Sequence, residues 1–162
     1  VIYYGDEQGF TGDGGDQDAR EDMFPSKVST YNDNKLIGTD ATTAASNFDP
    51  KHPLYRAIAE MGRAYKAHPA LRNGKLVVRR SEKEGGGLFA LSRFDAATGD
   101  EYLFVANIGL EPREAQIEVD PRSSRWTSLM GRCEKRAAAQ GSLKVRVGAQ
   151  DFLLCRAARA KK

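Results

Sequence analysis

The sequence predicts a mainly β fold, in which a C-terminal antiparallel β-sandwich follows the last strand and helix of a larger α/β barrel. Three observations lead to this prediction. Seven short apolar segments alternate with turn residues between residues 75 and 156, one amphipathic helix precedes them, and one apolar run opens the chain. A strand needs hydrogen-bonded neighbours, and nothing stands before this first run. The order of elements therefore suits the end of a larger barrel better than a single compact domain.

The opening residues Val1–Tyr4 ("VIYY") are apolar or aromatic and predict a buried strand. Gly5 interrupts the run, and Asp6 and Glu7 follow it directly. In α/β barrels the active site forms at the carboxyl ends of the strands, so we expect these two acids near a site. We expect the partners of this strand in an upstream part of a longer polypeptide. The polar stretch that follows, up to residue 50, is either a functional loop or disordered.

Residues 51–68 predict a helix. Pro53 suits a first helical turn, and Asp49 or His52 stands where a capping residue is expected. Pro69 ends the helix, and a short "ALRNG" turn runs on to Gly74. Helical spacing places four larger residues on one apolar stripe, with Ala57 and Ala64 beside it: Leu54, Ile58, Met61 and Tyr65.

The period changes after residue 74, and the rest of the chain predicts strands. Turn signals such as "KEGGG", "ATGD" and "DPRSS" separate them. We expect two domains: residues 1–74 as the last part of a barrel and residues 75–162 as an all-β domain. The seven expected strands are 75–80, 87–94, 101–109, 115–119, 125–130, 143–147 and 151–157.

Charge is unevenly spread over the 162 residues, although the net charge is only +3. Residues 1–50 hold ten acids and three bases, and residues 121–162 hold eleven bases and two acids. The C-terminal bases alternate with apolar residues, as on solvated strand faces, so we expect no nucleic-acid partner. No run of eighteen apolar residues occurs, so we expect no membrane partner. Compartment is left open.

The two cysteines, Cys133 and Cys155, are too few for a zinc site or a disulfide framework. They either pair with each other across strands or remain buried thiols, and the sequence does not decide between these states. Trp126 lies in an expected strand, and we expect it in the sandwich core.

Three segments resemble α-amylase family glycoside hydrolases. "VIYYGDEQG" is similar to the eighth strand of that family's TIM-type (β/α)8 barrel and the loop after it. "GGDQDAREDMF" resembles the continuation of this loop, and "HPLYRAIAEMGRAYKAHPALRNG" resembles the last barrel helix. Residues 75–162 are similar only in architecture, to the family's C-terminal β domain. The resemblance implies that this chain is the C-terminal end of a longer enzyme.

The resemblance also implies what is missing. The family's three catalytic carboxylates stand on barrel strands four, five and seven. The resemblance therefore implies that this chain contains no catalytic residue. A calcium site usual in many members lies upstream, so we expect no cofactor or metal in this chain. Asp13, Asp16 and Asp18 lack the spacing of an EF-hand. The substrate of the intact enzyme would be an α-glucan or oligosaccharide.

Asp16 and Arg20 are the expected substrate-binding residues. A carboxylate accepts hydrogen bonds from sugar hydroxyls, and a guanidinium donates them in a planar fork. The resemblance implies the same role, on a sugar just beyond the cleaved one. The alternative is that Arg20 only pairs with Asp16, Asp18 or Glu21 at a turn. Adjacent Asp6 and Glu7 would face opposite sides of a strand, which argues against a catalytic pair.

The sequence thus predicts the C-terminal part of an α-glucan hydrolase or transglycosidase, inactive by itself, whose β domain stabilises the barrel. The alternative function is a carbohydrate-binding β-sandwich module without catalysis. The aromatic residues Phe10, Phe24 and Tyr31 on the long loop would either stack on sugars or anchor the loop. The exposed edges of a lone barrel strand also predict self-association, or disorder of residues 1–50, in the isolated chain.

Overall fold

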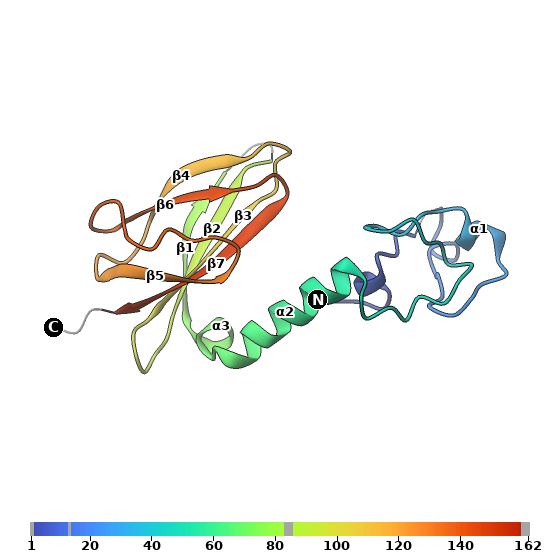
Figure 1. Ribbon diagram of the computed structural model, residues 1–162, viewed down its shortest axis with the longest axis horizontal. Coiled ribbons are helices and arrows are strands. Elements are labelled where there is room, and N and C mark those ends of the chain that lie inside the picture. Colours follow the sequence, from blue (N-terminus) through green and yellow to red (C-terminus); the bar gives the residue numbers. More distant parts are fainter. Residues whose placement is uncertain (1, 13, 83–85, 160–162) are drawn as a thin grey trace. The chain divides into compact units, whose positions relative to one another are not determined.

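The computed structural model describes residues 2–12, 14–82 and 86–159 of the chain (Figure 1). The chain forms two compact units, Val1–Ala64 and Tyr65–Lys162. The first unit is made of loops, short helices and most of one longer helix, and the second holds the end of that helix, a short helix and a β-sandwich. The domain boundary expected between residues 74 and 75 stays a prediction about the longer protein.

The expected strand at residues 1–4 is wrong in its described part. Ile2 and Tyr3 have no regular secondary structure, Tyr4 begins a turn, and Val1 lies outside the described residues. No strand is assigned in the described part of the first unit, so this segment has no ladder to join. The short 3₁₀-helix η1 (Asp6–Gln8) follows instead, and α1 (Ser29–Asn32) lies further along the loop.

The predicted helix is confirmed as α2 (Pro53–Ala67). His52 caps it, because its Nδ1 accepts a hydrogen bond from the Leu54 N–H at 3.2 Å. Asp49 shapes the turn before the cap, where its carboxylate accepts the Lys51 N–H at 2.8 Å. None of the residues of α2 is buried. The expected apolar stripe is only partly covered, because Leu54 and Ile58 are half-buried whereas Met61 and Tyr65 are exposed.

The "ALRNG" segment forms the short helix α3 (Ala70–Asn73), which ends at Gly74. Arg93 holds this end to the sandwich, because its Nη1 donates to the carbonyls of Arg72 and Gly74 at 3.3 and 3.1 Å. Gly74 has no room for a side chain, since an added Cβ would lie 2.4 Å from the Ala70 carbonyl oxygen.

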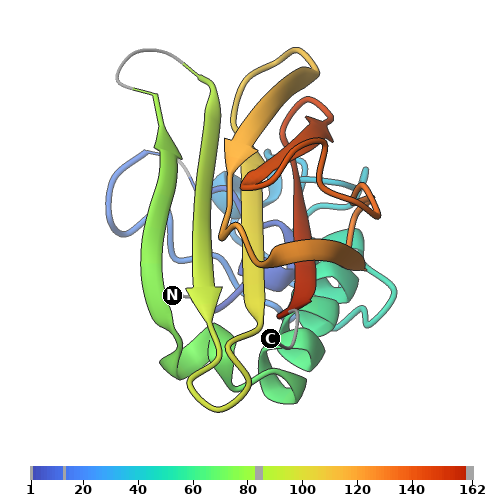
Figure 2. The ribbon, with the colours of Figure 1, turned by 90° about the vertical axis from the view of Figure 1, so that its left-hand side faces the viewer.

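All seven predicted strands are confirmed, with small shifts at their ends. They form an antiparallel five-stranded sheet in the order β1-β2-β3-β7-β5 and a two-stranded sheet of β4 and β6. Figure 2 shows β1, β2, β3 and β7 side by side, with β4 and β6 in front of them. The strands are β1 (Lys75–Ser81), β2 (Leu88–Phe94), β3 (Glu101–Asn107), β4 (Arg113–Glu118), β5 (Ser123–Met130), β6 (Ser142–Val147) and β7 (Asp151–Arg159).

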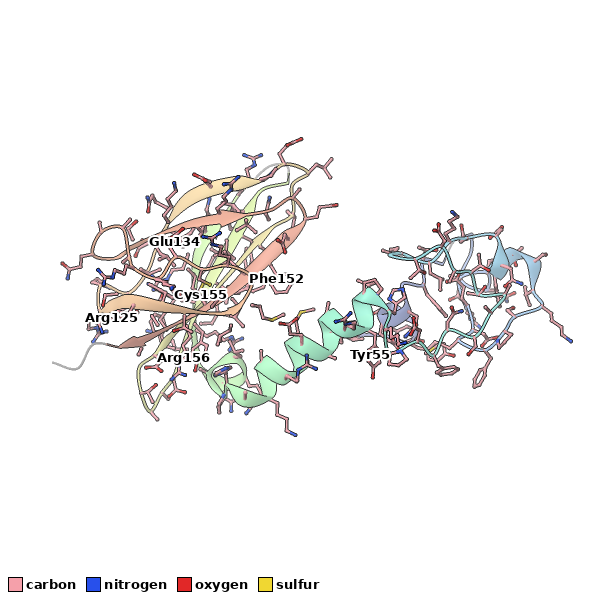
Figure 3. All side chains as sticks on the ribbon, viewed as in Figure 1. Tyr55, Arg125, Glu134, Phe152, Cys155 and Arg156 are labelled. Atoms are coloured by element: carbon pink, nitrogen blue, oxygen red, sulfur yellow. A yellow bond between two sulfur atoms is a disulfide. The ribbon has the colours of Figure 1, made fainter. Side chains whose placement is uncertain are left out.

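The main hydrophobic core lies between the two sheets. Alternate residues of β3 and β7 face it, and the β6 residues at positions 143, 145 and 147 meet them from the other layer. Trp126 belongs to this core and is 4% exposed, as expected from the sequence. Cys133 and Cys155 form a disulfide that joins the segment after β5 to β7, which settles the open alternative. Figure 3 places Cys155 among the strands of the sandwich.

The outer face of the five-stranded sheet carries an apolar row as well, beside polar positions such as Arg93 and Arg156. One row of cross-strand neighbours runs over all five strands: Val78, Leu91, Phe104, Leu154 and Met130. Phe104 also contacts Phe152, with 5.8 Å between ring centroids. Val78 at the edge is 55% exposed. This face therefore holds an apolar row with polar residues beside it, whereas the inner face is the main hydrophobic core.

Candidate functional site

The candidate site begins where η1 turns the chain. Gly5 and Gly9 flank η1 with φ values of 91° and 75°, a region that only glycine adopts at low cost. A Cβ at Gly9 would lie 2.3 Å from the Ile37 carbonyl oxygen, so the backbones meet closely there. The Ile37 N–H donates to the Gly9 carbonyl at 2.8 Å. The loop is thereby folded back against its own later part.

An open pocket of about 780 Å³ lies over this turn and is lined mainly by polar groups. Its volume falls within the range of about 300–1,000 Å³ that is usual for small-molecule sites. Tyr4 and Phe10 supply its aromatic part, in an edge-to-face contact with 6.5 Å between centroids. Its polar part comes from residues between positions 6 and 22, namely Asp6, Asp16, Arg20, Glu21 and Asp22.

Asp16 and Arg20 both line this pocket and form an ion pair, with 2.5 Å between Oδ2 and Nη2. Their side chains are 85% and 66% exposed, so water competes for both groups. An exposed ion pair of this kind adds only about 0–1 kcal/mol to stability. The pairing expected for Arg20 at a turn is thus present, and it leaves donors and acceptors open to the pocket. Their role in substrate binding stays a prediction.

Glu21 is the buried acid of the pocket, at 6% exposure. Its Oε2 accepts a hydrogen bond from the Gly12 N–H at 3.1 Å. This bond links the two ends of the segment that carries Asp16 and Arg20. Gln8 is also buried, and its side chain exchanges two hydrogen bonds with the backbone of Asp49, at 3.1 and 3.3 Å. Sequence reasoning missed both bracing residues, because a polar side chain in an acidic loop carries no pattern that indicates burial.

Asp6 and Glu7 do not converge. Asp6 lines the pocket that holds Asp16, and its Oδ2 accepts the Tyr3 N–H at 2.7 Å. Glu7 lines a separate hollow, beside Tyr55 and Ile58 of α2. The divergence comes from the 3₁₀ turn and not from the alternation of a strand, which was the expected reason. These two acids therefore do not face one bound sugar.

The other aromatic residues of the loop differ in their surroundings. Tyr31 donates its hydroxyl to the Gln17 carbonyl at 3.2 Å and so anchors the loop. Phe24 and Phe48 contact each other edge to face at 4.9 Å, and both are largely exposed. The sequence pointed to Phe24 but not to Phe48, because their positions are far apart in the chain.

A second polar cluster lies in the unit that holds the sandwich. Tyr102 and His68 share a hydrogen bond of 3.2 Å between the hydroxyl and Nδ1. Burial, followed by the charge of Arg156, lowers the pKa of His68, and burial raises the pKa of Tyr102. Asp100 accepts two hydrogen bonds from Arg156, the shorter of 2.6 Å, which raises the pKa of the guanidinium. This cluster ties the end of α2 to β3 and β7.

Within the described ranges, no three His, Cys, Asp or Glu side chains come together as a possible metal site. Asp13, one of the acids considered for calcium, lies outside the described residues. No helix in the described part of the chain combines the length and the hydropathy needed to cross a membrane.

Comparison with known proteins gives one sequence relative and a common fold. No known family profile matches the chain. Over 116 residues it is 49% identical to an α-amylase of Streptomyces lividans, a match that covers 71% of this chain and 12% of that protein.

Solved structures with a similar fold include an α-amylase from H. orenii, with a TM-score of 0.58 and 18% identity over 96% of this chain and 32% of that one. An Anoxybacillus α-amylase has a TM-score of 0.57 and 14% identity over 78% and 27% of the two chains. A Nostoc punctiforme debranching enzyme has a TM-score of 0.54 and 18% identity over 74% and 27%. The chain therefore spans well under half of each of these proteins, including the curated relative.

Proposed function

Because this chain is an α-amylase family sequence that covers 12% of its curated relative, we propose that it is the C-terminal part of a longer glycoside hydrolase acting on α-glucans. The observation that carries the proposal is the exposed Asp16–Arg20 ion pair in the wall of an open pocket. Its carboxylate and guanidinium offer acceptors and donors to the hydroxyls of one glucose unit.

In this proposal the catalytic carboxylates belong to the rest of the polypeptide. Retaining hydrolysis needs a nucleophile and an acid/base about 5 Å apart, on either side of the scissile bond. Asp6 and Glu7 line different hollows, so they do not supply such a pair. Transfer to another sugar would use the same covalent intermediate, with a sugar hydroxyl in place of water. This chain contributes substrate binding and support.

An activity measurement tests this division of roles. The purified chain should release no nitrophenol from a nitrophenyl α-maltooligoside, whereas the longer polypeptide that contains it should release nitrophenol. Hydrolysis by the purified chain alone would overturn the proposal.

The β-sandwich serves in this proposal to stabilise the barrel, consistent with the apolar row on the outer face of its larger sheet. A carbohydrate-binding module is the alternative for this unit. Electrophoresis through gels that contain starch separates the two roles. Unchanged mobility of residues 65–162 supports a structural role, and retardation supports the module.

We expect the isolated chain to associate with itself, through apolar side chains and not through the strand edge first considered. Several large apolar side chains of the first unit and of α2 are exposed, among them Ile2, Tyr3, Met61 and Tyr65. Exposed apolar groups in this number favour association. Sedimentation velocity over a range of concentrations should show oligomers, and a monomer at every concentration would exclude this expectation.

A further inference from the structure

Phe24 and Phe48 form an exposed aromatic pair that the proposed function leaves unexplained. Their ring centroids lie 4.9 Å apart, with 64° between the ring planes. The side chains are 65% and 52% exposed, although each ring is wholly apolar. Two large apolar rings that meet at the surface form a patch, and a patch of this kind is more informative than a single exposed residue.

The backbone beneath this aromatic pair is fixed. Phe24 follows the buried Met23, and Phe48 follows the buried Asn47. The Asn47 N–H donates a hydrogen bond to the Met23 carbonyl at 2.8 Å. The Asn47 side chain donates to two further carbonyls, at 3.0 and 3.3 Å. A second link joins the same two stretches of chain, since the Ser26 N–H donates to the Thr43 carbonyl at 2.9 Å. The two rings therefore stand on a preorganised support.

The same support continues into the candidate pocket. The Met23 N–H donates to the Tyr4 hydroxyl at 3.1 Å, and Tyr4 is part of the pocket wall. Asp22, two residues before Phe24, lines the pocket as well. Phe24 thus follows directly on the chain segment that carries Asp16 and Arg20, and Phe48 joins it through the ring contact.

We propose that Phe24 and Phe48 form a second sugar-binding platform, which holds a further glucose unit of an α-glucan bound at Asp16 and Arg20. A pyranose has faces made of C–H groups and a rim of hydroxyls. Aromatic faces carry partial negative charge and attract such polarised C–H groups, while their apolar surface is removed from water. The two rings, whose planes meet at 64°, offer a corner that fits a curved α-linked chain. This inference rests on the proposed function.

The test uses the intact enzyme, that is, the longer polypeptide that contains this chain. Initial rates on maltotriose and on maltoheptaose give kcat and KM for the wild type, Phe24→Ala and Phe48→Ala. Each alanine variant should raise KM for maltoheptaose about tenfold, the loss expected for one stacking contact, and leave kcat unchanged. The KM for maltotriose should change by less than about twofold, because a short substrate ends before the platform.

Two further variants exclude a purely structural effect. Phe24→Trp keeps an aromatic face and should retain the preference for the longer substrate. Phe89→Ala removes a partly exposed ring from the sandwich unit and should change neither KM. Unfolding temperatures measured in parallel should agree within a few degrees.

The outcomes separate this inference from the function on which it rests. The ratio of the two KM values, maltotriose to maltoheptaose, is compared between the wild type and the alanine variants. If this ratio is the same in all three enzymes, the platform is overturned and the proposed function is left intact. The same holds if the KM values for both substrates rise equally, because the rings then only support the fold. An intact enzyme without action on α-glucans overturns both.

Discussion

Arg79 and Glu101 form a buried ion pair in the β-sandwich, with 2.9 Å between Nη2 and Oε1. The Glu101 side chain is fully buried, and the Arg79 side chain is 10% exposed. Glu101 also accepts hydrogen bonds from the Ser92 hydroxyl at 2.5 Å and from the Asp120 N–H at 2.9 Å. A buried carboxylate with several donors is tolerated, whereas a buried charge without its partner is costly.

We therefore predict that Arg79→Met destabilises the sandwich by about 3–5 kcal/mol, because it leaves the Glu101 carboxylate buried without its counter-ion. Urea unfolding followed by Trp126 fluorescence measures this, since Trp126 is the sole tryptophan of the chain and lies in the core. Glu118 is the matched control: it contacts Arg79 at 3.5 Å but is 80% exposed. Glu118→Gln should cost less than about 1 kcal/mol. Equal losses in the two variants would contradict the prediction.

The Cys133–Cys155 disulfide closes a loop between residues 22 positions apart in sequence. In the chain-entropy account a loop of this size adds about 3 kcal/mol of stability. The double variant Cys133→Ala/Cys155→Ala should lose about this amount in urea unfolding, together with a cavity cost at the buried Cys155. Unfolding midpoints that agree between this variant and the oxidised wild type would show that the disulfide does not stabilise the fold.

The disulfide also shows where sequence reasoning stops. Alternation and turn residues identify each strand locally, and this is why all seven strands were found. Pairing Cys133 with Cys155 requires knowing that the segment after β5 returns to β7, a contact between distant residues that no local pattern encodes. The prediction of a strand at residues 1–4 is wrong for a related reason. The apolar run at Val1–Tyr4 has strand propensity, but a strand forms only against a hydrogen-bonded neighbour.

The candidate site was predicted in part. The resemblance of "GGDQDAREDMF" to a family loop and the chemistry of an acid–arginine pair singled out Asp16 and Arg20, and the structure brings them together in one pocket. The parts that hold them in place were not predicted. Gln8 acts through the backbone of Asp49, 41 residues away, and Phe48 meets Phe24 only once the loop has folded.

His68 predicts a pH dependence of stability. Burial, then Arg156, lowers its pKa below the usual 6.5, so the unfolded chain binds the proton more readily. The stabilising contribution is complete above about pH 6.5 and is lost as the pH falls through the lower pKa of the folded state. Urea unfolding at pH 7.5 and pH 5 should show a smaller loss for His68→Gln than for the wild type. Equal losses would mean that His68 does not contribute.

Asp120 predicts a second pH effect, at more acid pH. The hydrogen bond from Arg122 is the main cause that lowers its pKa from 3.8 to about 2. Since the folded-state pKa is depressed, this stability is present above about pH 4 and is lost between pH 4 and pH 2. The contribution should be about 1 kcal/mol, because half of the Arg122 side chain is exposed and water screens the ion pair. Asp120→Asn should flatten acid unfolding in this range, and an unaltered acid profile would refute the assignment.

The final prediction concerns Asp16 and Arg20, whose proposed role is in binding and not in stability. Arg20→Ala should weaken binding of maltoheptaose to the intact enzyme by about tenfold to a hundredfold, the range for hydrogen bonds to a charged group. Unfolding should change by less than about 1 kcal/mol, because the ion pair is exposed. Titration calorimetry measures the first quantity and urea unfolding the second.

The same unit of the chain offers a matched control for Arg20. Lys35 and Asp40 form an exposed ion pair at 2.8 Å, and neither residue lines the pocket that holds Asp16. Lys35→Ala removes an equivalent charge and an equivalent surface contact, so it should leave the affinity for maltoheptaose unchanged. If Lys35→Ala and Arg20→Ala weakened binding equally, the effect would come from net charge. A loss for Arg20→Ala with no loss for Lys35→Ala assigns the binding of glucose hydroxyls to this pocket.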